Sequence, residues 1–254
     1  MKKNINIAVV GLGNIGIYLL NEINSKRKNI ELLTGKKINI SAVSAKNIKK
    51  KRKFKFNKSI FYKNPLNIFK EKKIDILFEC IGSSDGMSKK IVEKAIKNKS
   101  HVITPNKSLI AKHGNNLSKL AEKYKVNLEF EASVCGGIPI LRTIKEGLST
   151  NKLNKVYGIL NGTSNYILSE MESTKDTFEN VLKKAQILGY AEPGNATPDL
   201  NGGDAMSKVK ILSSLAFNNQ ISSHKCLMQG IENIESKDFE IADQLNLKIK
   251  LLGI

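Results

Sequence analysis

The residue types best suited to chemistry gather between positions 185 and 208, where the chain reads AQILGYAEPGNATPDLNGGDAMSK. Glu192, Asp199, Asp204 and Lys208 supply three carboxylates and an amine. Asp204 and Lys208 are four residues apart, so a helix would place them on one face. Amides at a helix N-terminus favour an ionised carboxylate, and a partly desolvated lysine one turn later is suited to proton transfer. A surface ion pair is the alternative, but the two further carboxylates favour a reaction site.

The element that would hold this pair is a helix. Residues 209–217, VKILSSLAF, have apolar side chains at helical spacing. Nearer the N-terminus, apolar strand patterns alternate with helical ones, which is typical of an α/β protein. A chain of 254 residues is long enough to bury a substantial core around such elements.

A dinucleotide-binding fingerprint lies at the start of the chain. Residues 5–10 form an apolar run typical of a buried strand, residues 11–16 read GLGNIG, and a helical pattern continues to residue 23. The first glycine allows the turn, the second lets the pyrophosphate approach, and the third lets helix and strand pack closely. The phosphates then face the amides at the helix N-terminus. The expected cofactor contacts here are Gly11, Gly13, Asn14, Ile15 and Gly16.

Three further segments are expected to be strands: residues 38–44, 74–79 and 101–104. They predict a Rossmann-type, doubly wound parallel sheet within residues 1–130, followed by a second domain in residues 131–254. Gly82 and Ser83 follow the second of these strands, at the edge where such a sheet binds its cofactor. They are therefore further candidate cofactor contacts.

The end of the strand at 38–44 should lie beside the adenine ribose. An NAD site usually carries Asp or Glu there. This chain instead has Lys46, followed by a basic tract at residues 49–53. A cation would accept the 2′-phosphate of NADP, so we favour NADP with Lys46 as a candidate contact and keep NAD as the alternative. A solvated loop is the competing interpretation of the basic tract, because the whole chain is rich in lysine.

The run at 185–208 resembles the signature of homoserine dehydrogenases. Ala196 stands where that signature has proline, and a proline follows at Pro198 instead. The positions that agree with the signature are Ala185, Gly189, Tyr190, Ala191, Asn195, Asp199, Leu200, Gly202, Asp204 and Lys208. The resemblance implies NAD(P)-dependent interconversion of L-homoserine and L-aspartate 4-semialdehyde, in threonine, methionine and isoleucine biosynthesis.

The resemblance also implies roles for individual side chains. Lys208 would relay the proton, and Asp204 would orient Lys208 and the substrate. Glu192 and Asp199 would receive the substrate ammonium group. Residues 158–168, GILNGTSNYIL, look like the element beside the substrate. Asn161, Gly162 and Thr163 there would offer polar groups and close backbone approach, with Thr163 as a substrate contact, and Ser164 or Thr163 would cap the helix that follows. Lys107 would lie near both the nicotinamide and the substrate.

Residues 129–142 resemble the family's crossover between its two domains. In the family this crossover binds a monovalent cation, usually sodium. The resemblance implies that the corresponding cation ligands in this chain are Glu131, Val134, Gly136 and Ile138. Residues 131–254 would then be an α+β catalytic domain that also forms a homodimer. Because family members continue beyond the matching segment, we expect either a fragment or a reduced enzyme. Residues 245–252 are expected to be a strand.

Three alternatives remain at this stage. One is a Rossmann oxidoreductase that acts on another semialdehyde or amino acid, and another is an inactive protein that only binds NADP. The net charge of +19 raises a third, a nucleic-acid-binding protein, but the lysines are spread along the chain and aromatic residues are few. No run is long enough to span a bilayer, no signal peptide precedes the first strand, and three scattered cysteines are typical of reduced thiols. We therefore expect a cytoplasmic protein with a small-molecule substrate.

Overall fold

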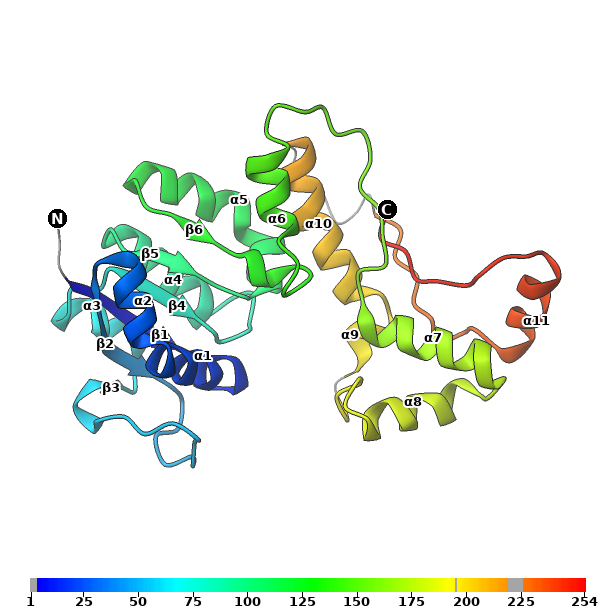
Figure 1. Ribbon diagram of the computed structural model, residues 1–254, viewed down its shortest axis with the longest axis horizontal. Coiled ribbons are helices and arrows are strands. Elements are labelled where there is room, and N and C mark those ends of the chain that lie inside the picture. Colours follow the sequence, from blue (N-terminus) through cyan, green and yellow to red (C-terminus); the bar gives the residue numbers. More distant parts are fainter. Residues whose placement is uncertain (1–3, 195, 219–225) are drawn as a thin grey trace. The chain divides into compact units, whose positions relative to one another are not determined.

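The computed structural model describes residues 4–194, 196–218 and 226–254. The chain divides into two compact units, Met1–Pro139 and Ile140–Ile254. This division falls somewhat later than the boundary expected near residue 130. Figure 1 shows the first unit in blue to green and the second in green to red.

The first unit is built on a parallel sheet of six strands. The strands are β1 (Asn4–Val10), β2 (Lys37–Ser44), β3 (Phe61–Tyr62), β4 (Ile76–Glu79), β5 (His101–Ile103) and β6 (Leu128–Glu129). Their order is β3-β2-β1-β4-β5-β6, and every adjacent pair is parallel. This is the Rossmann order, in which the direction of winding changes between β1 and β4. The strands expected at 5–10, 38–44, 74–79 and 101–104 are confirmed, with ends that differ by one or two residues.

Helices connect these strands and cover the sheet. They are α1 (Asn14–Ser25), α2 (Arg27–Thr34), α3 (Ile68–Glu71), α4 (Met87–Lys97) and α5 (Lys107–Tyr124), with 3₁₀ turns η1 (Lys58–Ile60), η2 (Pro65–Asn67) and η3 (Glu131–Ser133). α1 and α2 pack together, as do α4 and α5 (Figure 1). Right-handed crossovers on either side of β1 place these two pairs on opposite faces. The central strands are therefore buried: Ala8, Val9, Val43 and Leu77 have no exposed surface.

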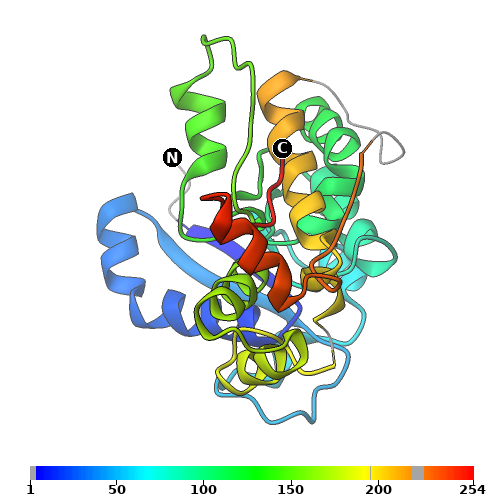
Figure 2. The same ribbon diagram turned by 90° about the vertical axis from the view of Figure 1, so that its right-hand side faces the viewer.

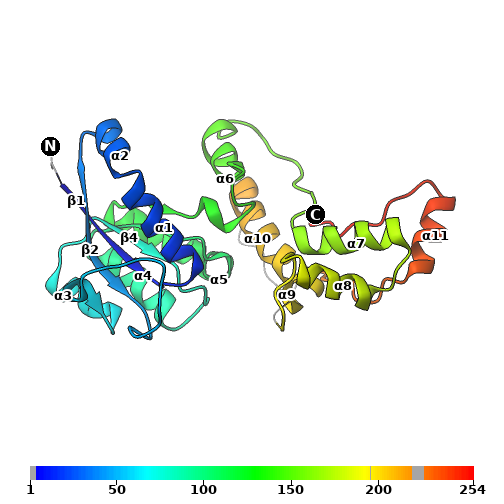
Figure 3. The same ribbon diagram turned by 60° about the horizontal axis from the view of Figure 1, so that its bottom comes forward.

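The second unit is helical in its described residues. It contains α6 (Ile140–Arg142), a π turn η4 (Thr143–Gly147), α7 (Gly162–Thr174), α8 (Phe178–Ile187), α9 (Thr197–Leu200), α10 (Gly203–Phe217) and α11 (Ser236–Gln244). α7 and α8 lie side by side (Figures 1 and 3), and α11 packs on α7 (Figure 2). Their apolar faces meet in one core, where Leu168 and Met171 of α7 pack with Val181 of α8 and Phe239 of α11. This core fixes the start of α7 and the loop that precedes α10.

The sequence expectation for residues 245–252 differs from the structure. These residues follow α11 without forming a strand, and one antiparallel bridge joins Gly158 to Gly253. A run of apolar residues becomes a strand only where another strand pairs with it, and the described residues supply only that bridge. Within the same described residues, no helix is both long enough and apolar enough to cross a membrane.

Candidate active site

The glycine-rich turn between β1 and α1 has the geometry of a phosphate-binding loop. Gly11 has a φ of +100°, and a Cβ there would lie 2.3 Å from the carbonyl oxygen of Cys80. A Cβ on Gly16 would lie 2.0 Å from the carbonyl oxygen of Gly11. By contrast, nothing lies within 4 Å of a Cβ built on Gly13, the N-cap of α1. Gly11 and Gly16 are thus required by close packing, while Gly13 leaves open space at a helix N-terminus, where an anion is favoured.

The other expected cofactor contacts lie on neighbouring turns at the same edge of the sheet. Asn14 and Ile15, which follow Gly13, are exposed on the first turn of α1. Gly82 and Ser83 are exposed on the turn after β4, and Gly82 has a φ of +94°. Lys107 is the first residue of α5. The turns after β1, β4 and β5 therefore meet at the carboxyl edge of the sheet.

Lys46 is exposed two residues beyond the end of β2. The loop that follows folds back toward the glycine-rich turn, because Arg52 donates from Nε to the carbonyl oxygen of Leu12 at 3.3 Å. The same guanidinium donates to the carbonyl of Asn47 at 2.7 Å. The basic tract is thus anchored beside the phosphate-binding loop by one arginine.

A buried carboxylate joins the turns after β4 and β5. Glu79 has no exposed surface and accepts hydrogen bonds from the amide of Ile81 at 2.8 Å and from the hydroxyls of Ser88 and Thr104. Asn106, the N-cap of α5, donates to Glu79 and to the carbonyl oxygen of Ser83. Four donors compensate for the buried charge. The sequence analysis missed this network, because Glu79 looks like the last residue of an apolar strand.

The segment expected to hold a cation turns sharply. After η3, both Cys135 and Gly137 have positive φ values, +49° and +89°. Glu131, Val134, Gly136 and Ile138 lie on this turn and would offer one carboxylate and three main-chain carbonyls. In the part of the chain that the structure describes, no cluster of three His, Cys, Asp or Glu side chains could hold a metal. A cation would therefore depend on carbonyl ligands, which suit a hard ion.

In the second unit, Asp204 and Lys208 form the expected pair on the first two turns of α10. Nζ of Lys208 lies 2.7 Å from Oδ2 of Asp204, and the side chains are 17% and 2% exposed. The same Nζ donates to the carbonyl oxygen of Leu160 at 2.6 Å. A charge pair this buried is held much more firmly than one on the surface.

Asn161 links this pair to Asp199. Its Nδ2 donates to Oδ1 of Asp199 and to Oδ2 of Asp204, both at 2.7 Å. Its Oδ1 accepts from the amide of Ser164 at 2.7 Å. Asn161 is thus the N-cap of α7, which corrects the expectation that Ser164 or Thr163 caps this helix. Oδ1 of Asn161 reaches the amide at the third helical position, whereas Ser164 bonds to the carbonyl oxygen of Asp199 instead.

Thr163 follows Asn161 by two residues, and Glu192 belongs to the loop between α8 and α9. The hydroxyl of Thr163 donates to the carbonyl oxygen of Tyr190 at 2.6 Å. The Tyr190 ring stacks on Tyr166, with centroids 4.3 Å apart. Glu192 is exposed two residues later on the same loop. Asn195, which belongs to the signature run, lies outside the described residues.

Comparison with known proteins supports one family. The model described as "Homoserine dehydrogenase, NAD binding domain" matches residues 11–131, and the model described as "Homoserine dehydrogenase" matches residues 139–254. The homoserine dehydrogenase of Neisseria gonorrhoeae is 40% identical over 252 residues. The chain belongs to the homoserine dehydrogenase family. The homoserine dehydrogenase of Bacillus subtilis is 35% identical over the same length.

Solved homoserine dehydrogenases have the same fold. The S. aureus enzyme, crystallised at pH 6.0, superposes with a TM-score of 0.86 at 40% identity and covers the whole chain. The enzyme of Thiobacillus denitrificans gives 0.88 at 36% identity. The chain spans 57% and 58% of the lengths of the Neisseria and Bacillus proteins. It covers 63% of the S. aureus chain and 58% of the Thiobacillus chain.

Proposed function

We propose that the protein is a homoserine dehydrogenase, which interconverts L-homoserine and L-aspartate 4-semialdehyde with a nicotinamide cofactor. The observation that carries this proposal is the group of Asp199, Asp204 and Lys208, joined by Asn161, in which Asp204 is buried and the other two are partly buried. It combines a proton donor with carboxylates that suit an amino-acid substrate. The Rossmann unit supplies the other requirement, a dinucleotide-binding turn.

Lys208 is the proposed acid–base group. An ammonium has three N–H donors, and within the described residues two of them are directed to Asp204 and Leu160. The third remains for the substrate oxygen. In the reducing direction Lys208 would give its proton to the aldehyde oxygen as the hydroxyl forms, and in the oxidising direction it would take that proton back. Asp204 would hold the amine in place through their 2.7 Å contact.

Glu192, together with Asp199, is proposed to bind the substrate ammonium group through charge-assisted hydrogen bonds. Thr163 supports this assignment because it fixes the carbonyl of Tyr190, two residues before Glu192. Lys107 is proposed to contact substrate and cofactor from the first turn of α5. The predicted contributions of Glu192 and Lys208 can be measured separately, because loss of Glu192 should raise the Michaelis constant of the substrate and loss of Lys208 should lower kcat.

The cofactor is proposed to be NADP, which supplies the hydride chemistry when bound. The open space beside Gly13 and the turn at Gly82 and Ser83 fit a dinucleotide. Lys46, beside the loop anchored by Arg52, favours a 2′-phosphate over a free hydroxyl. A sodium ion on Glu131, Val134, Gly136 and Ile138 is part of the same proposal, because these oxygen donors suit a hard cation.

A homodimer formed by the second unit is also proposed. Ile187, Leu188 and Leu227 are exposed there, at 85%, 57% and 93%, and a partner subunit would cover apolar surface of this kind. The proposal places the protein in the cytoplasm, where reducing conditions keep thiols such as those of Cys80 and Cys135 in the reduced state.

The direct test is to follow reduced-cofactor absorbance with purified protein and L-aspartate 4-semialdehyde. Consumption of NADPH that requires the semialdehyde supports the proposed function. NADPH binding without turnover would instead favour the inactive, cofactor-binding alternative. Parallel assays with NADH would measure the preference between the two cofactors. Lys46→Ala should lower the rate with NADPH relative to that with NADH, and should leave the rate with NADH unchanged.

A further inference from the structure

The turn between β4 and α4 carries two candidate cofactor contacts but has considerable backbone freedom. Gly82 and Gly86 both have positive φ values, +94° and +68°, and a Cβ built on either would meet nothing within 4 Å. Glycines in an open turn lose more conformational entropy on ordering than other residues do. Gly82 and Ser83 can therefore form a fixed surface for the cofactor only if other contacts hold this turn.

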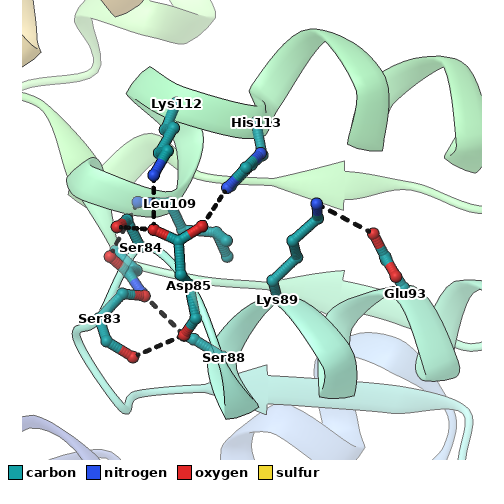
Figure 4. Close-up of polar contacts among 10 residues, drawn as sticks. Ser83, Ser84, Asp85, Ser88, Lys89, Glu93, Leu109, Lys112 and His113 are labelled. Atoms are coloured by element: carbon teal, nitrogen blue, oxygen red, sulfur yellow. Dashed lines mark hydrogen bonds and ion pairs between the residues drawn. The ribbon is translucent and has the colours of Figure 1, made fainter.

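Asp85 provides those contacts on the outer side of the turn. Its Oδ2 lies 2.7 Å from Nζ of Lys112, and its Oδ1 lies 2.8 Å from Nε2 of His113, both on α5 (Figure 4). The Ser84 hydroxyl donates to Oδ2 at 2.7 Å, and the Ser83 hydroxyl donates to the Asp85 carbonyl at 3.1 Å. The Asp85 carboxylate thus binds two basic side chains of α5, Lys112 and His113, and the hydroxyl of Ser84 in its own turn.

The inner side of the turn is fixed independently. Asn106 at the start of α5 donates to the carbonyl oxygen of Ser83 at 2.8 Å, and Glu79 accepts from the amide of Ile81. The turn is therefore attached to α5 at two points, through the carbonyl of Ser83 to Asn106 and through the Asp85 carboxylate to Lys112 and His113. α5 begins with Lys107, so the same attachments also fix the turn relative to that residue.

The charge state of Asp85 makes the outer attachment persistent. Hydrogen bonds from Lys112, Ser84 and His113 hold the pKa of the Asp85 carboxyl well below its usual range. The carboxylate is therefore ionised throughout the neutral range, whatever the protonation of His113. The Asp85 side chain is half exposed, at 51%, while His113 is largely covered, at 13%.

We propose that Asp85 is a positioning residue for the nicotinamide cofactor: it ties the turn between β4 and α4 to Lys112 and His113, and so holds Gly82 and Ser83 in the conformation that receives the cofactor. This inference rests on the proposed function, because it assumes that these two residues contact a dinucleotide. Asp85 itself need not touch the cofactor. Its effect is to lower the ordering cost that binding would otherwise carry.

The test compares NADPH dissociation constants, measured directly by nucleotide fluorescence, with thermal unfolding of the same variants. Asp85→Ala should raise the dissociation constant roughly two- to fivefold, the range expected for partly exposed ion pairs. Asp85→Asn, which keeps hydrogen-bonding capacity, should fall between Asp85→Ala and the unaltered chain. The double variant Asp85→Ala/His113→Ala should bind NADPH no more weakly than Asp85→Ala alone, because both substitutions remove the same Asp85–His113 contact.

Glu93→Ala is the matched control. Glu93 pairs with Lys89 on the adjacent helix α4, at 3.9 Å and with 34% exposure, but does not touch the turn (Figure 4). Its loss should leave NADPH binding unchanged. An unchanged dissociation constant in Asp85→Ala, or an equal rise in Glu93→Ala, would overturn the inference. If the unaltered chain bound no NADPH at all, the proposed function would fail first and this inference with it.

Discussion

Lys208 and Asp204 lie one helical turn apart on α10, with Nζ and Oδ2 separated by 2.7 Å in a largely buried setting. Oδ2 of Asp204, which pairs with Lys208, also accepts a hydrogen bond from Nδ2 of Asn161. The same Nδ2 donates to Oδ1 of Asp199. A proton donor and two carboxylates are therefore positioned by one neutral side chain. This arrangement gives the group a fixed geometry before any substrate binds.

Asn161→Ala should destabilise the protein by about 3 kcal/mol, since it removes a helix cap and takes one hydrogen bond from each of two carboxylates, Asp199 and Asp204. Asn161→Asp is the informative partner, because it keeps the acceptor for the Ser164 amide but places a third carboxylate beside Asp199 and Asp204. It should lose turnover while retaining the cap. Urea unfolding and steady-state rates measure the two effects. An Asn161→Ala protein within about 0.5 kcal/mol of the parent would contradict the bridging role.

Gly11→Ala should lower the folding stability, whereas Gly13→Ala should lower the affinity for NADPH. An alanine at Gly11 meets the Cys80 carbonyl at 2.3 Å and requires a φ of +100°, so it should cost about 3 kcal/mol or more of folding stability. An alanine at Gly13 meets nothing within 4 Å. It should fold normally but weaken NADPH binding about tenfold or more, because its methyl group enters the space for the pyrophosphate. Calorimetry and nucleotide titration separate the two; tight binding by Gly13→Ala would argue against this binding site.

These glycines and the pair on α10 show what the sequence alone can predict. The spacing of Gly11, Gly13 and Gly16 follows a strand directly, and Asp204 and Lys208 are local neighbours on one helix. Asn161 is different, because it meets Asp199 and Asp204 across 38 and 43 residues. Contacts at such distances in the sequence depend on how α9 packs with α7 and with α10, which periodicity does not reveal.

The carbonyl of Leu160 could not be predicted either, since every residue carries a carbonyl and only the fold selects one. The Glu79 network was missed for a similar reason. Its donors come from three separate segments, and only the folded sheet brings Ile81, Ser88 and Thr104 around one carboxylate. The expected strand at 245–252 failed because its formation depends on a pairing partner.

Glu192→Ala should raise the Michaelis constant for L-homoserine by about tenfold, as expected when a charge-assisted hydrogen bond is lost, with little change in kcat. Glu179→Ala, which alters another exposed glutamate, at the start of α8, serves as the control and should behave like the parent. Initial rates over a range of homoserine concentrations provide both constants. Equal Michaelis constants for the two variants would remove Glu192 from the substrate site.

The Cys80 thiol should resist alkylation in alkaline solution. Burial first, and the neighbouring Glu79 charge second, raise the pKa of Cys80 to about 12. At pH 9 only about one folded thiol in a thousand is then ionised, and the thiolate is the reactive form. The raised pKa stabilises the fold fully below the ordinary thiol pKa, and this contribution is lost as pH rises from there toward 12. Mass spectrometry after iodoacetamide treatment at pH 9 measures the reaction; labelling as fast as in urea would contradict this description.

The most direct test of the central claim is the rate of NADPH oxidation by L-aspartate 4-semialdehyde in Lys208→Ala. The unaltered chain should turn over. The variant should lose about 10²- to 10⁴-fold in kcat, the range for a missing acid–base group, while binding NADPH as before. Lys183→Ala, an exposed lysine on α8, should keep the parent rate. Turnover in Lys208→Ala that equals the parent rate would contradict the assignment of Lys208 as the proton relay.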